Sequence, residues 1–267
     1  MTRPENLPDF GEPPLAEVVL GVQFSPCPGF TSVDTRKVYE LFESDYPVIQ
    51  EHPRLEPHYE TFGGVKAQPG LQFHVGAPQT GSRLWFISRD GGRILQFQLD
   101  RFFSNWRKTS AEEEYPRFEG IAQTFKSHLT DLENHFSSGF SYQLDINQVE
   151  ITYVNLISID SFSEVSDFFS IAENLHVDFE GLNMSFSEEI RDSSDSARAR
   201  MSHSIQSLFT HNGQKRAFNL TLTVKGRPSG SDIDSAIDFI TKGRTAIVQR
   251  FAEITSASAH RKWKREQ

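Results

Sequence analysis

Cysteine and long apolar runs are almost missing from the sequence, and each absence removes a class of protein. Cys27 is the single cysteine, so no disulfide can form within the chain, which fits a reducing compartment. No window approaches the run of about 18 apolar residues that a membrane-spanning helix needs. The N-terminal stretch MTRPENLPDFGEPPL lacks the cationic start and apolar run of a signal peptide. We therefore expect a cytoplasmic protein that does not enter a membrane.

Positive charge is also in short supply. The chain has 27 lysine and arginine residues against 36 acidic residues, which gives a formal net charge of −9. Binding to nucleic acid or to anionic membranes depends on an excess of cationic side chains that neutralise phosphates. The composition therefore disfavours a general nucleic-acid-binding protein, although it leaves room for a local basic site.

Catalytic motifs are absent as well. The sequence contains no G-x-S-x-G elbow, no G-x-x-x-x-G-K-[ST] phosphate loop and no G-x-G-x-x-G fingerprint. His128, Asp131 and His135 share one face of a predicted helix, where the polar, solvated side of an amphipathic helix explains them better than a metal site. We expect no metal, cofactor or catalytic site. An enzyme whose residues meet only in space remains an alternative.

Aromatic residues are abundant, and the 23 phenylalanines should supply much of the core volume. After an extended, weakly ordered arm at 1–14, the first part of the chain has a strand pattern at 15–24 and a short helix that stops at Pro47. The remaining pattern consists of strand-like runs near 48–56, 71–76, 83–88 and 93–99, followed by a long amphipathic helix whose apolar stripe runs from Phe118 to Phe136.

The second part of the chain repeats this order. A strand at 148–159 and a short helix at 163–169 precede strands near 175–190, 199–210 and 218–226. Ser231 and Asp234 form an S-x-x-D capping box, and the helix that follows ends near Ser256. We predict an α+β fold with two pseudo-symmetric halves, 15–140 and 141–267, that share one continuous antiparallel sheet backed by two long helices. The order is similar to the topology of the TATA-binding protein.

Several segments together carry a family resemblance. They are EPPLAEVVLGVQF, LQFQLDRFFSNWRK, YPRFEGIAQTF, QVEITYVNLI and IVQRFAEITSASAHRKW. In this order they resemble a sporadically distributed family of uncharacterised prokaryotic proteins of about this length, and the resemblance spans nearly the whole chain. The family has no established activity. Its distribution resembles that of mobile defence or toxin–antitoxin genes, which implies an accessory role of that kind.

The predicted sheet has a polar face opposite its core. Side chains that alternate with the core set are Gln96, Gln98, Thr152, Asn219, Thr221, Thr223 and Lys225. Most are neutral hydrogen-bonding groups, whereas an idle solvent face usually carries mixed charges. Such a face could bind a protein, a nucleic acid or a second copy of the chain. The β-propensity of threonine beside solvated glutamine explains the same pattern equally well.

The stretch RILQFQLDRFFSNWRK starts as a strand and then loses its alternation. We expect Phe102, Phe103 and Trp106 to fold over the sheet edge as buried rings. Arg101, Arg107 and Lys108 would then form a basic corner beside Trp106, unless Arg101 pairs with a nearby acid.

The sequence thus favours a non-catalytic binding or regulatory protein that recognises a protein partner. The predicted partner-binding residues are Gln96, Gln98, Arg101, Arg107, Lys108, Asn219, Thr221 and Thr223. An antitoxin-like role would fit the acidic charge if the partner were basic. A nucleic-acid-binding module that uses the same face and the basic corner is the first alternative.

Overall fold

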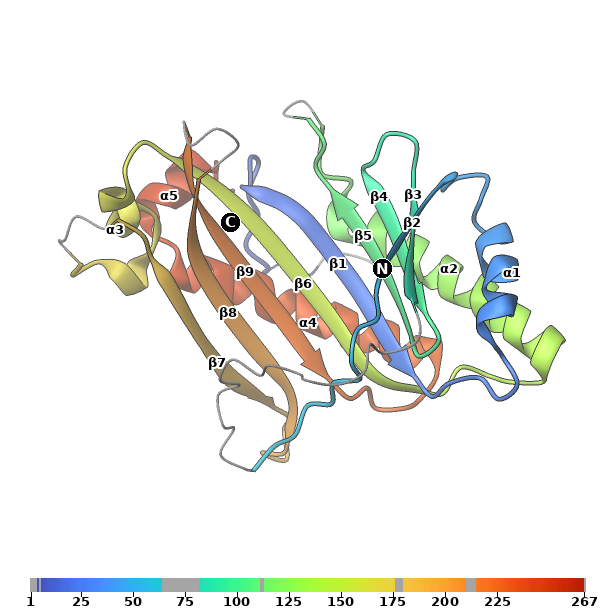
Figure 1. Cartoon of the computed structure of the whole chain (residues 1–267). Helices are drawn as coiled ribbons and strands as arrows, with labels where there is room; N and C mark the ends of the chain where they lie inside the picture. Colours follow the sequence, from blue (N-terminus) through green and yellow to red (C-terminus); the bar gives the residue numbers. More distant parts are fainter. Residues whose placement is uncertain are drawn as a thin grey trace, which may run out of the picture.

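The computed structural model describes residues 4, 6–63, 82–110, 113–175, 180–209 and 215–266. It confirms the α+β class, with helices packed on a nine-stranded antiparallel sheet (Figure 1). The strands are β1 Leu15–Phe24, β2 Val48–Pro53, β3 Ser82–Ile87, β4 Arg93–Gln98, β5 Arg101–Arg107, β6 Ile146–Ile159, β7 Asn183–Arg191, β8 Ala197–Phe209 and β9 Arg216–Gly226. The α-helices are α1 Thr35–Glu40, α2 Arg117–Phe140, α3 Val165–Phe168, α4 Ile233–Ile254 and α5 Ala257–Lys262. Short 3-10 turns lie at Ser32–Asp34, Phe162–Glu164 and Ser170–Ala172.

The strands are arranged in the order β2-β3-β4-β5-β1-β6-β9-β8-β7. β1 and β6 lie side by side near the centre although they are far apart in the sequence (Figure 1). In the register of these strands, Leu20 of β1 is opposite Ser104 of β5 and Ile151 of β6. A single sheet therefore runs through strands from both predicted halves of the chain.

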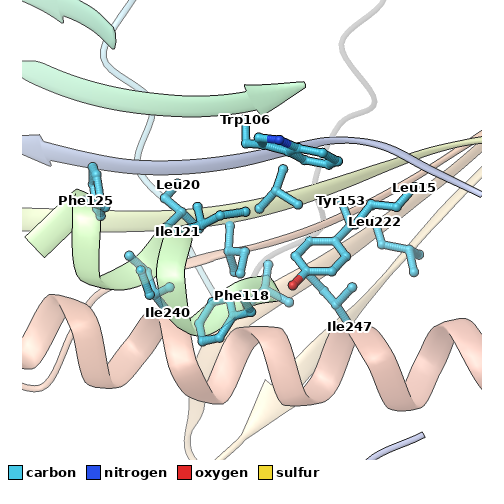
Figure 2. Packing of buried hydrophobic residues seen from close by; sticks show 14 of the residues in the cluster. Leu15, Leu20, Trp106, Phe118, Ile121, Phe125, Tyr153, Leu222, Ile240 and Ile247 are labelled. Carbon is cyan, nitrogen blue, oxygen red and sulfur yellow. The ribbon is translucent and has the colours of Figure 1, made fainter. Parts of the chain in front are cut away.

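The two long helices cover one face of the sheet. Ile121 and Phe125 of α2 and Ile240 and Ile247 of α4 point towards the strands, whereas the ring of Phe118 lies against α4 (Figure 2). Each such buried side chain contributes about 1.5–3 kcal/mol through the removal of apolar surface from water.

Gly243 allows α4 to lie close to the sheet. A Cβ atom at this position would be 2.7 Å from Cγ2 of Ile151 and 3.3 Å from Cγ1 of Val224. Any larger residue would push the helix away from β6 and β9.

The stretch RILQFQLDRFFSNWRK forms a complete β-hairpin, so the prediction that the chain folds over the sheet edge after residue 99 is wrong. β4 turns at Leu99 and Asp100 and returns as β5, which pairs with both β4 and β1. The two turn residues include no glycine, asparagine or proline, and the usual sequence signal for a two-residue hairpin is therefore missing. Phe102, Phe103 and Trp106 are buried as predicted, but within the sheet and not over its edge.

The N-terminal arm is better anchored than predicted. Phe10 is buried against Phe251 and Trp263, and the amides of Gly11 and Glu12 donate to the carbonyls of Lys264 and Trp263. The arm therefore pairs with the C-terminal end of the chain.

Two predicted strands have a different outcome. The strand at 71–76 lies outside the described residues, and in the run near 175–190 the strand β7 begins at Asn183. None of the helices in the described ranges has the length and apolar character needed to cross a bilayer.

Candidate binding surface on the outer sheet face

The outer face of the sheet, opposite α2 and α4, is partly covered by the chain itself. Residues 54–62, here called the strap, have no regular secondary structure and cross the lower end of the sheet toward β8 (Figure 1, cyan). The strap follows directly after the edge strand β2. Side chains of several strands of the sheet form hydrogen bonds with the strap.

The first two contacts come from the β4–β5 hairpin. Gln98 accepts a hydrogen bond from the Leu55 amide at 2.8 Å and donates to the Leu55 carbonyl at 2.9 Å. Arg101, the next residue along the row, donates to the Glu56 carbonyl at 2.9 Å. Leu55 is thus bound through both its backbone amide and its carbonyl, and Glu56 through its carbonyl.

The central strands supply the next two contacts. Oε1 of Gln23 on β1 accepts from the His58 amide at 3.3 Å. Oε1 of Gln148 on β6 accepts from the Glu60 amide at 3.2 Å. Gln23 and Gln148 are directly opposite each other in the β1–β6 register, so the strap passes from one strand to its neighbour.

β8 makes the last contact of the series. Nε of Arg200 lies 2.8 Å from Oε2 of Glu60, and Nη2 donates to the Thr61 carbonyl at 3.0 Å. The guanidinium also lies over the ring of Phe62, 5.5 Å from its centroid.

We call Gln98, Arg101, Gln23, Gln148 and Arg200 the strap-binding row. Their contacts with the strap are mostly to main-chain groups, and these contacts follow the strand order β4, β5, β1, β6, β8. An amide side chain has both a donor and an acceptor, as a peptide unit has, and can therefore pair with main chain of almost any sequence. The strap side chains Leu55 and Tyr59 remain 36% and 53% exposed. The row thus recognises the strap through its backbone.

This geometry corrects three of the predicted partner-binding residues. Gln96, Gln98 and Arg101 are 7%, 2% and 4% exposed, so the expectation that they lie on an accessible surface is wrong. Gln98 and Arg101 are occupied by the strap, whereas Gln96 donates to Asn105 at 2.9 Å. The alternative that Arg101 pairs with an acid is confirmed, because its Nε lies 3.4 Å from Oδ1 of Asp100.

The predicted basic corner does not form. Arg101 begins β5 and Arg107 ends it, which places them about 20 Å apart at the rise of an extended strand. Arg107 donates to the Gly91 carbonyl at 2.7 Å, Lys108 is exposed, and Trp106 is buried on the helix-covered face. Arg101 and Trp106 therefore cannot form one site with Arg107 and Lys108.

A charged rung, Glu150–Lys225–Arg200–Glu189, lies next to the strap on β6, β9, β8 and β7, and the outer face beyond it is accessible. Three rungs of facing residues cross these four strands, and we call them together the open face. The rungs are Thr152–Thr223–Ser202–Ser187, Val154–Thr221–Ser204–Ser185 and Leu156–Asn219–Gln206–Asn183. The predicted residues Asn219, Thr221 and Thr223 are therefore on the outer face, half-buried among neighbours of the same kind.

Ten of the twelve positions carry a neutral hydroxyl or amide, and none carries a charge. Among these polar side chains, the described residues provide one mutual bond, between the hydroxyls of Thr152 and Thr223 at 2.8 Å. Two large apolar side chains lie at one border of the face, Leu156 within the third rung at 41% and Leu208 beyond it at 38% exposed. The face can therefore offer hydrogen bonds and an apolar border to an incoming molecule.

Most of this face carries a sequence signal beyond the predicted residues Asn219, Thr221 and Thr223. Ser202, Ser204 and Gln206 alternate with buried residues of β8, and Asn183, Ser185 and Ser187 have the same spacing on β7. Alternation of small neutral polar residues on adjacent strands would have indicated the face. The strap-binding row had no comparable signal, because Gln98 and Leu55 are 43 positions apart, and Gln148 and Glu60 are 88 apart.

The histidines of α2 serve packing. No group of three or more metal-ligating side chains occurs in the described part of the chain. The prediction that His128 lies on a solvated face is wrong. Its ring packs edge-on against Phe42 and Tyr46, with distances of 5.3 and 5.6 Å between ring centroids. Burial lowers the pKa of His128, which keeps the imidazole neutral at pH 7.

Comparison with known proteins adds no function to this geometry. No family model matches the chain, and no curated protein matches it. The resemblance to a sporadically distributed prokaryotic family stays a hypothesis based on the quoted segments.

Proposed function

We propose that this chain is a non-catalytic binding or regulatory protein that recognises a protein partner through its open face. The observation that carries the proposal is the strap. On the same sheet, side chains of the same chemical kind already hold an extended polypeptide by its main chain. The open face offers ten further neutral groups with no described strap across them.

The chemistry of the open face favours protein over nucleic acid. Its three rungs contain no lysine or arginine, and in the neighbouring rung Lys225 is paired with Glu150 at 3.1 Å and Arg200 with Glu60 at 2.8 Å, so the face offers few cations to neutralise phosphates. Neutral hydroxyls and amides pair well with peptide groups and with uncharged side chains, and they cost little to desolvate compared with ions.

The size of the face sets what the partner must contact. Three rungs on four strands measure about 14 Å in each direction, or about 200 Å², whereas each side of a stable complex buries about 800 Å². The partner should therefore extend beyond the polar rungs. Leu156 and Leu208 are the exposed apolar side chains at this border, and we assign them as anchors.

The proposal also covers the internal symmetry of the chain and its cellular role. We infer that the halves 15–140 and 141–267 are related by pseudo-symmetry, with β1 and β6 as equivalent central strands and a TATA-binding-protein-like arrangement as an analogy. The strand order on either side of the β1–β6 pair supports this. A role in a prokaryotic accessory system, such as defence or a toxin–antitoxin pair, depends on the family resemblance alone.

The experiment is co-expression with the proteins encoded by adjacent genes, followed by size-exclusion chromatography and calorimetric titration of any complex. The double variant Ser202→Lys and Gln206→Lys places two cations on exposed positions of β8. It should weaken the complex at least tenfold, because two charges would be desolvated without partners. The matched control, Ser127→Lys with Thr130→Lys on exposed positions of α2, adds the same charge and should bind like the wild type.

Two results would overturn the proposal. One is a complex that tolerates the β8 double variant but not the α2 control. The other is a wild-type protein that binds none of these neighbours yet binds DNA or RNA with an affinity that falls steeply with salt, which would favour the nucleic-acid alternative.

A further inference from the structure

A cavity of about 70 Å³ lies on the helix side of the sheet, away from the outer face. The N-terminal arm closes it on one side, through Pro8, Phe10 and Pro13. β6 and the start of α2 contribute further walls, and α4 closes the remaining side. Its lining is mainly apolar and includes Leu15, Phe118 and Ile247. The hydroxyl of Tyr153 points towards the side where Phe118 and Ile247 lie (Figure 2).

Two tyrosine hydroxyls meet in this cavity. The hydroxyls of Tyr115 and Tyr153 lie 3.2 Å apart and form one hydrogen bond. In such a pair one hydroxyl donates and the other accepts, so the O–H proton of the accepting tyrosine is left to donate elsewhere. Burial raises the pKa of both phenols, and both therefore remain protonated donors at neutral pH.

Arg244 of α4 brings a buried positive charge to the same cavity. It is 6% exposed and its guanidinium lies 5.2 Å from the centroid of the Phe118 ring. Its carboxylate neighbour, Glu119, is 3.5 Å away, which is long for a charge-assisted bond. The Nε–H of Arg244 has no partner among the described residues. A buried arginine normally uses this donor, because leaving it unpaired is costly.

The wall at the start of α2 is conformationally unusual. Arg117 has a φ of 65°, a region that residues with a Cβ atom rarely adopt, and its side chain reaches across to Asp9 of the arm at 3.0 Å. Backbone conformations of this kind concentrate at ligand-binding positions. The arm and α2 are thus held in a fixed geometry around the cavity mouth.

We propose that this cavity binds a small monocarboxylate with a short apolar chain. The carboxylate would accept from Arg244 and from the tyrosine pair, and the chain would lie against Leu15 and Ile247. A water needs about 10–15 Å³ of such volume, so the cavity has room for roughly five or six non-hydrogen atoms. That matches three- or four-carbon acids, of which propionate and butyrate are the simplest probes. Larger acids fit only if they extend past the arm.

Calorimetry and thermal unfolding of the full chain with propionate and butyrate test this site, with propionamide and butyramide as uncharged controls of the same shape. The acids should bind saturably and raise the melting temperature, and the amides should not. Arg244→Met should weaken binding by about tenfold or more, since it removes the charge-assisted bonds. Tyr153→Phe should weaken it by a smaller factor.

Glu119→Gln separates a ligand site from a structural arginine. It removes the competing carboxylate and leaves Arg244 in place, so affinity for butyrate should rise by roughly threefold while the amides still do not bind. If neither acid binds saturably to the wild type, the cavity holds only water and the proposal is wrong. If butyrate binds but Glu119→Gln leaves its affinity unchanged, Arg244 does not hold the carboxylate and the proposal is wrong as well. These outcomes are independent of the open face, because no residue is shared.

Discussion

The strap-binding row and the open face are built on one sheet from similar side chains, yet they have opposite relations to solvent. Gln98 and Gln148 are 2% and 4% exposed because the strap lies on them, whereas Ser202 and Gln206 on β8 are exposed. The row includes two arginines, and the open face has no charge. The polar sheet face thus stabilises the fold where the strap covers it, and it is available for binding where no described residues cover it.

This difference has an energetic consequence. In the row, each side chain has lost water and gained a specific partner, so its removal leaves buried groups unsatisfied. On the open face, water replaces whatever a substitution removes. The same chemical change should therefore be costly in one region and nearly neutral in the other, and the following predictions test that contrast.

Arg101→Met should have the largest effect. The guanidinium donates to the Glu56 carbonyl and to Gln23 at 3.1 Å, and it lies beside Asp100, which is itself 4% exposed. Removing it leaves a buried carboxylate and two acceptors with fewer partners, at a cost of about 3 kcal/mol or more. Urea unfolding followed by tryptophan fluorescence measures the change. Lys108→Met, at the exposed far end of the hairpin, should stay within about 0.5 kcal/mol.

Gln98→Leu and Gln148→Leu should release the strap to different extents. Gln98 holds both backbone groups of Leu55, and Gln148 holds one amide, so we expect losses of about 2 and about 1 kcal/mol. Limited proteolysis should show faster cleavage within the strap for both variants than for the wild type, and Gln98→Leu should be cleaved faster than Gln148→Leu. Equal cleavage rates in wild type and variants would mean that the row does not hold the strap.

The sequence predicted one part of this comparison and could not predict the other. Local periodicity identified β1, α2, β6, β9 and α4 and placed Asn219, Thr221 and Thr223 on the outer face, because alternation depends only on neighbours in the chain. The covering of Gln98 and Arg101 depends on a segment more than 40 positions away, and no local pattern encodes it.

The β4–β5 turn and the tyrosine–arginine cavity were missed for related reasons. Leu99 and Asp100 turn without the glycine or asparagine typical of a two-residue hairpin, and the pairing of β5 with β1 supplies stability that this local sequence does not signal. Tyr115 lies in the loop before α2, Tyr153 on β6 and Arg244 on α4. Burial of charged and polar groups also has no sequence signature, so Gln96 and Arg101 resembled surface residues.

Acid should weaken the strands of the open face through His203, which lies on the opposite side of β8. Its ring stacks on Phe186 of β7 at 4.2 Å, and it faces Glu188 at 3.5 Å, with Arg250 also nearby. Desolvation lowers the pKa of His203 below 6.5 in the folded state. Between that lower value and 6.5 the unfolded chain binds more protons, so stability is full above pH 6.5 and falls as the pH decreases.

Hydrogen exchange of β7 and β8 between pH 7 and pH 5, corrected for the intrinsic rate, measures this effect. Protection of β7 should fall more than protection of β4. His203→Gln cannot titrate and should flatten the dependence of β7, while His128, whose pKa is also lowered by burial, leaves a pH dependence elsewhere. An unchanged slope in His203→Gln would assign the acid sensitivity to other groups.

The smallest effect on folding should come from the open face itself. Thr223→Val removes the 2.8 Å bond to Thr152 from a half-buried position, and the β-branched shape is retained, so unfolding should change by no more than about 0.5 kcal/mol. The Ser202→Lys and Gln206→Lys pair should be equally mild in urea unfolding and should leave cleavage of the strap unchanged. If these variants instead destabilise the fold as much as Gln98→Leu, the side chains of the open face stabilise the folded state. Their uncharged character would then be explained by folding, without a binding partner. Near-neutral stability combined with loss of a complex would assign the same residues to recognition.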